Sequence, residues 1–335
     1  MVIASETLKL FKIEGAVDSI APLGFGHIND SYSVEIGGHS YLLQRLNTRV
    51  FLEPRVVESN LSRLLEHSPE LFPQHVKGPN GQYHQSDGEN TWRVQEFVAD
   101  SYSPIELTID ELREIAKGYG RYTAQFTSEK TDQYLEAIQG FHDLHFRLKQ
   151  FEEAVKTNKA NRMDLSSLEI EQIKGFAWIA SEFDQMVQNG LPQRVCHNDA
   201  KAGNCLLSKK TGDFLKIVDL DTVGPGYVLF DLGDILRSML FNIPENHADL
   251  NDLVYDASRT ETILESFLQE CGDLLSQMEK ETLTFGGLYM TYIMAVRFLT
   301  DYLNGDIYYK ISYPEENLIR TRNQLKILQL MHAAF

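Results

Sequence analysis

The sequence predicts an α+β protein with two lobes, a small β-rich lobe followed by a larger, mainly helical lobe. Short strand patterns and turns fill the first hundred residues, and long helical patterns fill most of the rest. The length of 335 residues also exceeds the usual size of a single domain. We expect residues 1–98 to form the β-rich lobe and residues 99–335 to form the helical lobe. No repeat, low-complexity stretch or long linker interrupts this order.

A glycine pair marks the first hairpin of the smaller lobe. Residues 31–36 and 40–46 read as strands on either side of Gly37 and Gly38. Glycine allows the positive φ angles that a tight two-residue hairpin turn requires. The other elements expected here are one helix against the sheet, over residues 53–66, and a second hairpin over residues 82–85 and 92–98.

Two patterns of the capping-box type mark helix starts in the larger lobe. Thr108 with Glu111 predicts one start, and Ser166 with Glu169 predicts another, for a helix that ends near Gly190. Further helical patterns cover residues 260–271, 279–303 and 315–331.

Composition limits the partners and the compartment. Asp and Glu number 48 against 31 Lys and Arg, which gives a net charge of −17. Nucleic acid is not an expected partner, because its binding needs a basic surface. The three cysteines do not suggest a disulfide framework, and no signal peptide or membrane span is recognisable. We expect a cytoplasmic protein without a membrane partner, and the sequence leaves the oligomeric state open.

One non-helical stretch of the second half carries the main chemical motif. It reads HNDAKAGN at 197–204, which is H-x-D-x-x-x-x-N, and the apolar run KIVDLD then ends in Asp219 and Asp221. In phosphoryl transfer such an aspartate accepts the proton of the attacking hydroxyl, while an asparagine and a second aspartate hold Mg²⁺. We expect Asp199 to be the base, Asn204 and Asp219 to be the metal ligands, and ATP to be the co-substrate. A turn that only caps strands is the alternative.

A second turn is expected to cover the nucleotide. Gly24 and Gly26, in PLGFGHINDSY, would let backbone N–H groups approach a phosphate, although a plain hairpin turn has the same composition. The backbone at Glu96 and Val98 would receive adenine where the first lobe ends. This second assignment depends on position alone.

These motifs resemble the aminoglycoside phosphotransferase and choline kinase superfamily, whose fold is protein-kinase-like. A more specific resemblance, to the N-acetylhexosamine 1-kinases, extends from near residue 20 to near residue 330. It is carried by GFGHINDSYSV, YLLQRLN, WRVQEFV, FHDLHFR, VCHNDAKAGNCLL, IVDLDTVGPG, LFDLGDILR and RFLTDYLNGDIYYKISYPEENLIRTRNQLK. The resemblance implies ATP-dependent phosphorylation of GlcNAc or GalNAc at the anomeric hydroxyl, giving the α-1-phosphate.

The same resemblance implies a set of sugar-binding residues. His27 and Arg297 match positions expected to contact the sugar, and Tyr308 is a further candidate for the same wall. Asp221 would support the sugar or the metal, or it would cap the turn that follows. An arginine in the apolar helix around Arg297 should be paired or hydrogen-bonded, and Asp301 one turn later is the structural alternative.

Gln44 lies where protein kinases carry a lysine on the strand that faces ATP. Because glutamine has no charge, we expect Mg²⁺ and backbone N–H groups to handle the phosphate charge, with strong dependence on a divalent metal. Asp231 and Asp234 are expected to tie the segment 197–204, the catalytic loop, to the helix that follows.

Three alternatives remain open. The first is another kinase of the superfamily, acting on an aminoglycoside, choline, homoserine or methylthioribose. The second is a kinase-like module that binds ligands without catalysis, which the intact motif disfavours. The third is a metal-dependent oxygenase using His197 and Asp199, which would need a β-barrel where the sequence predicts helices.

Overall fold

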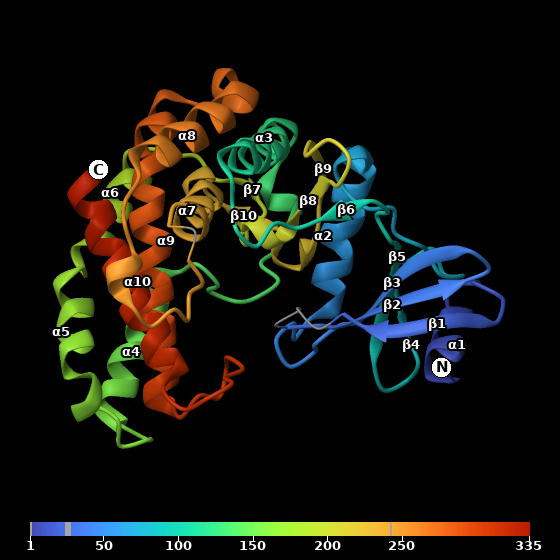
Figure 1. Cartoon of the computed structure of the whole chain (residues 1–335), viewed down its shortest axis with the longest axis horizontal. Helices are drawn as coiled ribbons and strands as arrows, with labels where there is room; N and C mark the ends of the chain where they lie inside the picture. The colour runs from blue at the N-terminus through green and yellow to red at the C-terminus, as the bar shows by residue number, and fades with distance from the viewer. Residues whose placement is uncertain (1, 24–27, 242) are drawn as a thin grey trace.

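The computed structural model describes residues 2–23, 28–241 and 243–335, and it has two lobes (Figure 1). The smaller lobe contains a five-stranded antiparallel sheet in the order β1-β2-β3-β5-β4. Its strands are β1 (Val17–Pro22), β2 (Asp30–Ile36), β3 (His39–Arg45), β4 (His84–Ser86) and β5 (Thr91–Glu96). Both expected hairpins are present, and Gly37 and Gly38 have φ angles of 56° and 82° at the first turn. The predicted α+β class with a β-rich and a helical lobe is confirmed.

A short N-terminal helix, α1 (Val2–Lys9), and not the helix after the first hairpin, covers the apolar side of this sheet. Leu8 and Phe11 pack there against Val34 and Leu43. The second helix, expected over residues 53–66, does contact the sheet, but through Glu58, which accepts the backbone N–H groups of Tyr83 and His84 at β4.

That second helix, α2 (Pro54–His67), runs between the sheet and the helical lobe in Figure 1. Its Leu61 and Leu64 are buried in the hydrophobic core of the larger lobe. Val57, one turn earlier, packs with Leu46 at the end of β3. The helix thus joins the two lobes, because its apolar stripe has partners at both ends.

The larger lobe is a set of helices around one core, with α9 at its centre. Thr108 begins the first long helix with the predicted capping box. Among the described residues, no helix combines the length and the apolarity needed to cross a membrane. The helices are α3 (Ile109–Phe126), α4 (Leu144–Thr157), α5 (Ser167–Gly175), α6 (Trp178–Gln188), α7 (Val228–Met239), α8 (Ala257–Cys271), α9 (Gln277–Asn304) and α10 (Glu316–Ala334).

The second predicted capping box is wrong. Ser166 does not cap, because its hydroxyl donates to the carbonyls of Arg162 and Met163. Glu169 instead accepts a hydrogen bond from Arg322 of α10 at 2.6 Å. The expected single helix is also divided, because α5 ends at Gly175 and α6 begins afresh.

Short strand pairs bring the motif segments of the larger lobe together. Strand β7 (Arg194–Cys196) pairs with β10 (Gly224–Gly226), and β8 (Cys205–Ser208) pairs with β9 (Phe214–Ile217). The chain leaves β5 and next forms β6 (Ser101–Tyr102), which pairs with β8. The boundary after residue 98 stays a prediction. These pairings place the catalytic loop beside the turn that follows β9.

Glycines allow α7 and α9 to approach closely. A Cβ added at Gly286 would lie 2.0 Å from the carbonyl oxygen of Leu229. One added at Gly233 would lie 2.2 Å from the carbonyl oxygen of Gly286. No side chain fits between backbones at these distances, so both glycines set the spacing of the two helices.

We expect G286A to lower the free energy of unfolding by roughly 1–3 kcal/mol, because the methyl group must push α7 away from α9. The control is G175A, at the end of α5, where an added Cβ meets nothing within 4 Å. Urea denaturation of both variants checks the prediction. Equal stabilities would show that the α7–α9 spacing is not limiting.

Candidate active site

Hydrogen bonds to Asp231 of helix α7 hold the catalytic loop in place. The backbone N–H groups of His197 and Asn198 donate to the two carboxylate oxygens of Asp231, at 2.8 and 2.7 Å. The expected tie through Asp231 is therefore confirmed. The same expectation for Asp234 is wrong, because its carboxylate accepts from Arg237 of its own helix at 2.8 Å. A buried carboxylate thus holds the loop at two consecutive residues.

The imidazole of His197 connects the catalytic loop to the strand before Asp219. Its Nε2 donates to the carbonyl of Val218 at 3.1 Å, and its Nδ1 accepts from the N–H of Asp199 at 3.3 Å. The ring is fully buried and meets Tyr119 edge to face. This histidine sets the position of both aspartates but is not exposed to a ligand.

Asp199 lies between a lysine and an amide. Its Oδ2 is 2.8 Å from Lys201 Nζ and accepts from Asn204 Nδ2 at 2.8 Å. Burial acts to raise the pKa of Asp199, but the charge and hydrogen bond of Lys201 outweigh it, so the pKa is lowered. The carboxylate therefore stays ionised at neutral pH and can accept a hydrogen bond from a substrate hydroxyl.

Asp219 is the carboxylate without a partner. Its backbone is left-handed, with φ of 60°, and its side chain has no hydrogen bond or ion pair to any described residue. The surrounding protein and the charges of Asp221 and Asp199 raise the pKa of Asp219 to about 6. The side chain of Asp219 is exposed to solvent, so burial contributes little to this raised pKa. The charges of Asp221 and Asp199 are therefore its main cause.

A divalent cation fits this place. The carboxylate of Asp219 and the amide oxygen of Asn204 are the hard oxygen donors that Mg²⁺ prefers. A cation here would also relieve the repulsion that raises the pKa of Asp219. The two predicted metal ligands thus suit the ion, and their role in binding it stays a proposal.

Asp221 is buried in a network that crosses between the lobes. It accepts both Nη groups of Arg93 from β5, with Nη2 at 3.1 Å, and Asn29 Nδ2 at 2.6 Å. Arg93 Nε in turn donates to Gln44 Oε1 at 2.9 Å. A direct contact from Asp221 to a sugar would require one of these hydrogen bonds to open, so its substrate role stays a prediction.

Sequence reasoning missed two cations of this site, Arg93 and Lys201. The signal for Lys201 was its place inside the motif, two residues after Asp199. The signal for Arg93 was weaker, since only the strand register shows that it pairs across β3 and β5 with Gln44. The register therefore places a buried arginine on the neighbouring strand, directly beside Gln44.

The predicted nucleotide residues are placed unevenly. Gly24, Gly26 and His27 lie outside the described residues. Glu96 is exposed at the end of β5, and its backbone N–H donates to the carbonyl of Gln74. The carbonyl of Val98 accepts from the hydroxyl of Ser101 at 2.7 Å. The assignment of this stretch to adenine stays a prediction.

Arg297 is buried on α9 among aromatic rings. Its guanidinium carbon is 4.8 Å from the ring centre of Phe141 and 5.7 Å from those of Tyr308 and Tyr309. Its one hydrogen bond within the described chain is a weak one to the sulfur of Met294, at 3.6 Å. The guanidinium therefore has N–H groups to offer a ligand.

The alternative ion pair between Arg297 and Asp301 is not formed. Asp301 instead accepts the backbone N–H groups of residues 307–309, at 2.8 to 3.0 Å, and an amide hydrogen bond from Asn317. Its role is to shape the loop that carries Tyr308. Helix α9 thus carries both Arg297 and Asp301. Asp301 positions Tyr308, the aromatic neighbour of Arg297.

A second guanidinium shares this place. Arg147 donates through Nε and Nη2 to the carbonyl of Phe141, at 3.4 and 3.3 Å. Burial and the charge of Arg297 lower the pKa of Arg147 to about 10, so it remains a cation at neutral pH. Both arginines line a pocket of about 540 Å³ with Tyr308 and Tyr309. That pocket is locally positive.

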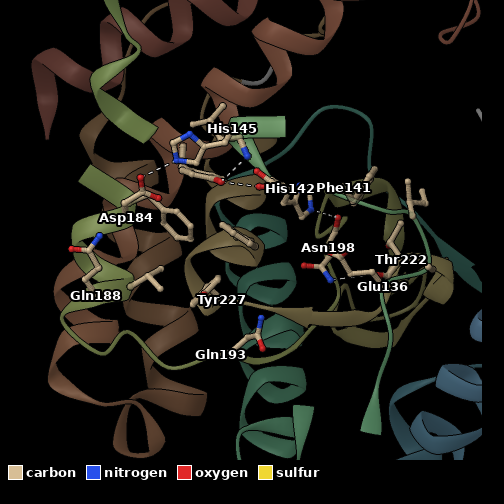
Figure 2. A pocket seen from close by; sticks show the side chains of 18 residues that line it. Glu136, Phe141, His142, His145, Asp184, Gln188, Gln193, Asn198, Thr222 and Tyr227 are labelled. Atoms are coloured by element: carbon tan, nitrogen blue, oxygen red, sulfur yellow. Dashed lines mark hydrogen bonds and ion pairs between the residues drawn. The ribbon is translucent and has the colours of Figure 1, made fainter. Parts of the chain in front are cut away.

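Another pocket, of about 360 Å³, includes Asn198 of the catalytic loop in its lining (Figure 2). Phe141 and Phe230 line it together with His142, whose Nε2 donates to the carbonyl of Asn198 at 2.8 Å. Asp199 does not line this pocket. It therefore borders the backbone of the loop and not the carboxylate of Asp199.

The fold and the loop define the class of small-molecule phosphotransferases with a kinase-like structure. The model of the phosphotransferase enzyme family (APH) matches residues 19–262. The chain belongs to this family.

Solved structures show the same fold at low sequence identity. A microcompartment-associated aminopropanol kinase is 14% identical with a TM-score of 0.67, over 99% of this chain and 96% of its own. Choline kinase LicA from Streptococcus pneumoniae is 15% identical with a TM-score of 0.62, over 100% and 99%. Spectinomycin phosphotransferase APH(9)-Ia, in complex with ADP and spectinomycin, is 12% identical with a TM-score of 0.64, over 98% of each chain.

We expect H142Q to flatten the pH dependence of stability. Burial and the charge of Arg297 lower the pKa of His142 to about 3, so the unfolded chain binds a proton that the folded chain does not. Stability is lost as the pH falls below about 6.5, at about 1.4 kcal/mol per pH unit for this group. Glutamine can keep the N–H donor to Asn198 without titrating.

Urea denaturation near pH 7 and near pH 5 measures this effect, and the wild type should lose about 2 kcal/mol more than H142Q on acidification. H39Q, at the exposed first residue of β3, is the control for loss of a histidine. Parallel pH profiles for wild type and H142Q would contradict the assignment of a neutral buried imidazole.

Proposed function

We propose that this phosphotransferase is an ATP-dependent anomeric kinase of N-acetylhexosamines, GlcNAc or GalNAc, giving the α-1-phosphate. The observation that carries the proposal is Arg297, which is 9% exposed and has no carboxylate partner among the described residues. A buried guanidinium with unused N–H groups suits the neutral hydroxyl and amide oxygens of such a sugar. Tyr308 and Phe141 add aromatic faces for its C–H groups.

The charge of this pocket separates the proposed acceptor from the cationic acceptors named for similar structures. Choline, aminopropanol and aminoglycosides are cations, as the names of the similar structures indicate. Arg147 and Arg297 would repel a cation placed between them, and a choline site would need an aromatic cage without a nearby positive charge. An N-acetylated amino sugar has no charge, so it avoids that repulsion.

The chemistry would follow from the carboxylate already described. Asp199 would accept the hydrogen bond of the anomeric hydroxyl and take its proton as the bond to phosphorus forms. Mg²⁺, held by Asn204 and Asp219, would neutralise charge on the ATP phosphates. Lys201 keeps Asp199 ionised and adds a positive charge beside the reacting group. His27 and Asp221 stay candidates for further sugar contacts.

The experiment is ADP release from ATP and Mg²⁺ with a panel of acceptors: free GlcNAc and GalNAc, their 1-O-methyl glycosides, choline, homoserine, methylthioribose and aminoglycosides. We expect turnover with the free N-acetyl sugars alone, because the methyl group removes the reacting hydroxyl. D199N should lose turnover by about a thousandfold or more while still binding ATP, and excess chelator should stop the reaction.

Turnover with a methyl glycoside would discard the anomeric position, and turnover with choline, homoserine, methylthioribose or an aminoglycoside would discard the sugar. Near-normal turnover of D199N would remove Asp199 as the base.

We expect R297M to raise the KM for the sugar by roughly 10- to 100-fold, because charge-assisted hydrogen bonds to the acceptor are lost. The KM for ATP should change little. R121M is the control, since Arg121 of α3 forms a partly exposed ion pair with Glu270 of α8 and lines neither pocket. Steady-state kinetics with each substrate varied in turn measures both constants. A stable R297M protein with an unchanged sugar KM would contradict this role.

A further inference from the structure

We propose that Arg93 is a positioning residue that replaces the absent lysine of β3 by holding Asp221, and with it the metal-binding turn, against the sheet of the smaller lobe. The proposal rests on the phosphotransferase function but not on which acceptor is used.

The first observation is that each of the three nitrogens of the Arg93 guanidinium donates a hydrogen bond. The side chain is 3% exposed, and its Nε, Nη1 and Nη2 donate to Gln44 and to both oxygens of Asp221. Gln44 is itself fixed by a hydrogen bond from Nε2 to the hydroxyl of Ser31, at 2.9 Å. A buried ion pair of this kind is directional, and removing one partner leaves an uncompensated charge.

The second observation is that Asp221 gathers further segments of the smaller lobe. Asn29 donates to it at 2.6 Å and accepts through Oδ1 from the backbone N–H of Asn47, at 2.9 Å. Asn29 precedes β2, and Asn47 follows β3. Hydrogen bonds to one carboxylate therefore fix the start of β2, and through it the end of β3, as well as the middle of β5.

The third observation is that the same turn holds the catalytic loop. Thr222, next to Asp221, donates its hydroxyl to the carbonyl of His197 at 2.9 Å. The Thr222 carbonyl accepts from Asn198 Nδ2 at 3.1 Å. A continuous set of hydrogen bonds thus runs from Arg93 through this turn to the residues directly before Asp199.

The geometry also separates positioning from direct nucleotide binding. A lysine that contacts phosphate must present its charge to the ligand, whereas the guanidinium of Arg93 is buried and already bonded to three side-chain atoms. Arg93 should therefore act on the placement of Asp219 and leave the contact surface for the nucleotide unchanged.

The test is the affinity for ADP, measured by isothermal titration calorimetry with Mg²⁺ and with excess EDTA. For R93Q we expect the gain in affinity from Mg²⁺ to fall by about tenfold, because the metal-binding turn loses its anchor. The affinity in EDTA should stay within about twofold of wild type. This readout needs no acceptor, so it remains decisive if the N-acetylhexosamine proposal fails.

Three further variants complete the test. R45Q is the matched control, because Arg45 is the neighbour of Gln44 on β3 and forms an exposed ion pair with Asp30. R93Q/D221N removes the unpaired buried charge, so it keeps the test valid if R93Q fails to fold, and it should show the same loss as R93Q. Q44K/R93Q places the cation on β3, at the strand partner of residue 93. This variant should recover part of the gain in ADP affinity that Mg²⁺ gives.

Two results would overturn the proposal. A loss of ADP affinity in EDTA as large as that in Mg²⁺ would make Arg93 a direct nucleotide contact. An unchanged Mg²⁺ effect in R93Q or R93Q/D221N, with only a lower melting temperature, would make the ion pair purely structural.

Discussion

Repulsion among three carboxylates is the constraint that the centre of this protein has to satisfy. Burial and the charges of Asp221 and Asp199 together raise the pKa of Asp219. The chain as a whole has a net charge of −17, so its average field adds to the problem. Only a nearby cation can offset this repulsion, so each carboxylate needs a positive charge within hydrogen-bond distance.

The charges are matched one by one. Lys201 pairs with Asp199 within the catalytic loop, and Arg93 pairs with Asp221 from the other lobe. Asp219 alone lacks a partner among the described residues, which leaves one excess negative charge at an open position. This arrangement fits a site completed by a divalent cation, since a protein cation at Asp219 would compete with the metal. The ion pairs therefore leave Asp219 as the carboxylate of the three at which a divalent cation would add the missing charge.

Much of the scaffold could be predicted from local sequence. The hairpin at Gly37 and Gly38, the capping box at Thr108 and the motif around Asp199 depend on residues close together in the chain. Ser166 shows the limit of such signals, because the expected cap lost to carbonyls of the preceding turn and to an arginine 153 positions away from Glu169.

The features that could not be predicted depend on long-range register. Arg93 reaches Asp221 across 128 positions, and only the pairing of β3 with β5 reveals that it replaces the cation missing at Gln44. The position of Asp301 under its loop is similarly a tertiary property, since helical spacing alone favours a pair with Arg297. Charged residues with two possible partners are resolved by burial and backbone donors, which a single sequence does not display.

In the proposed function, the acceptor would meet charges of opposite sign on its two sides, at Asp199 and at Arg297. His142 donates to the carbonyl of Asn198, next to Asp199, and the ring of its neighbour Phe141 lies 4.8 Å from the guanidinium carbon of Arg297. A ligand in contact with both sides would place a hydroxyl group at the carboxylate of Asp199. Its carbonyl or other hydroxyl oxygens would then lie at the guanidinium groups of Arg297 and Arg147. A neutral, polar molecule satisfies both ends, whereas a cation gains at the first and loses at the second. The positive charges of that second side, Arg147 on α4 and Arg297 on α9, come from segments outside the loop that carries Asp199.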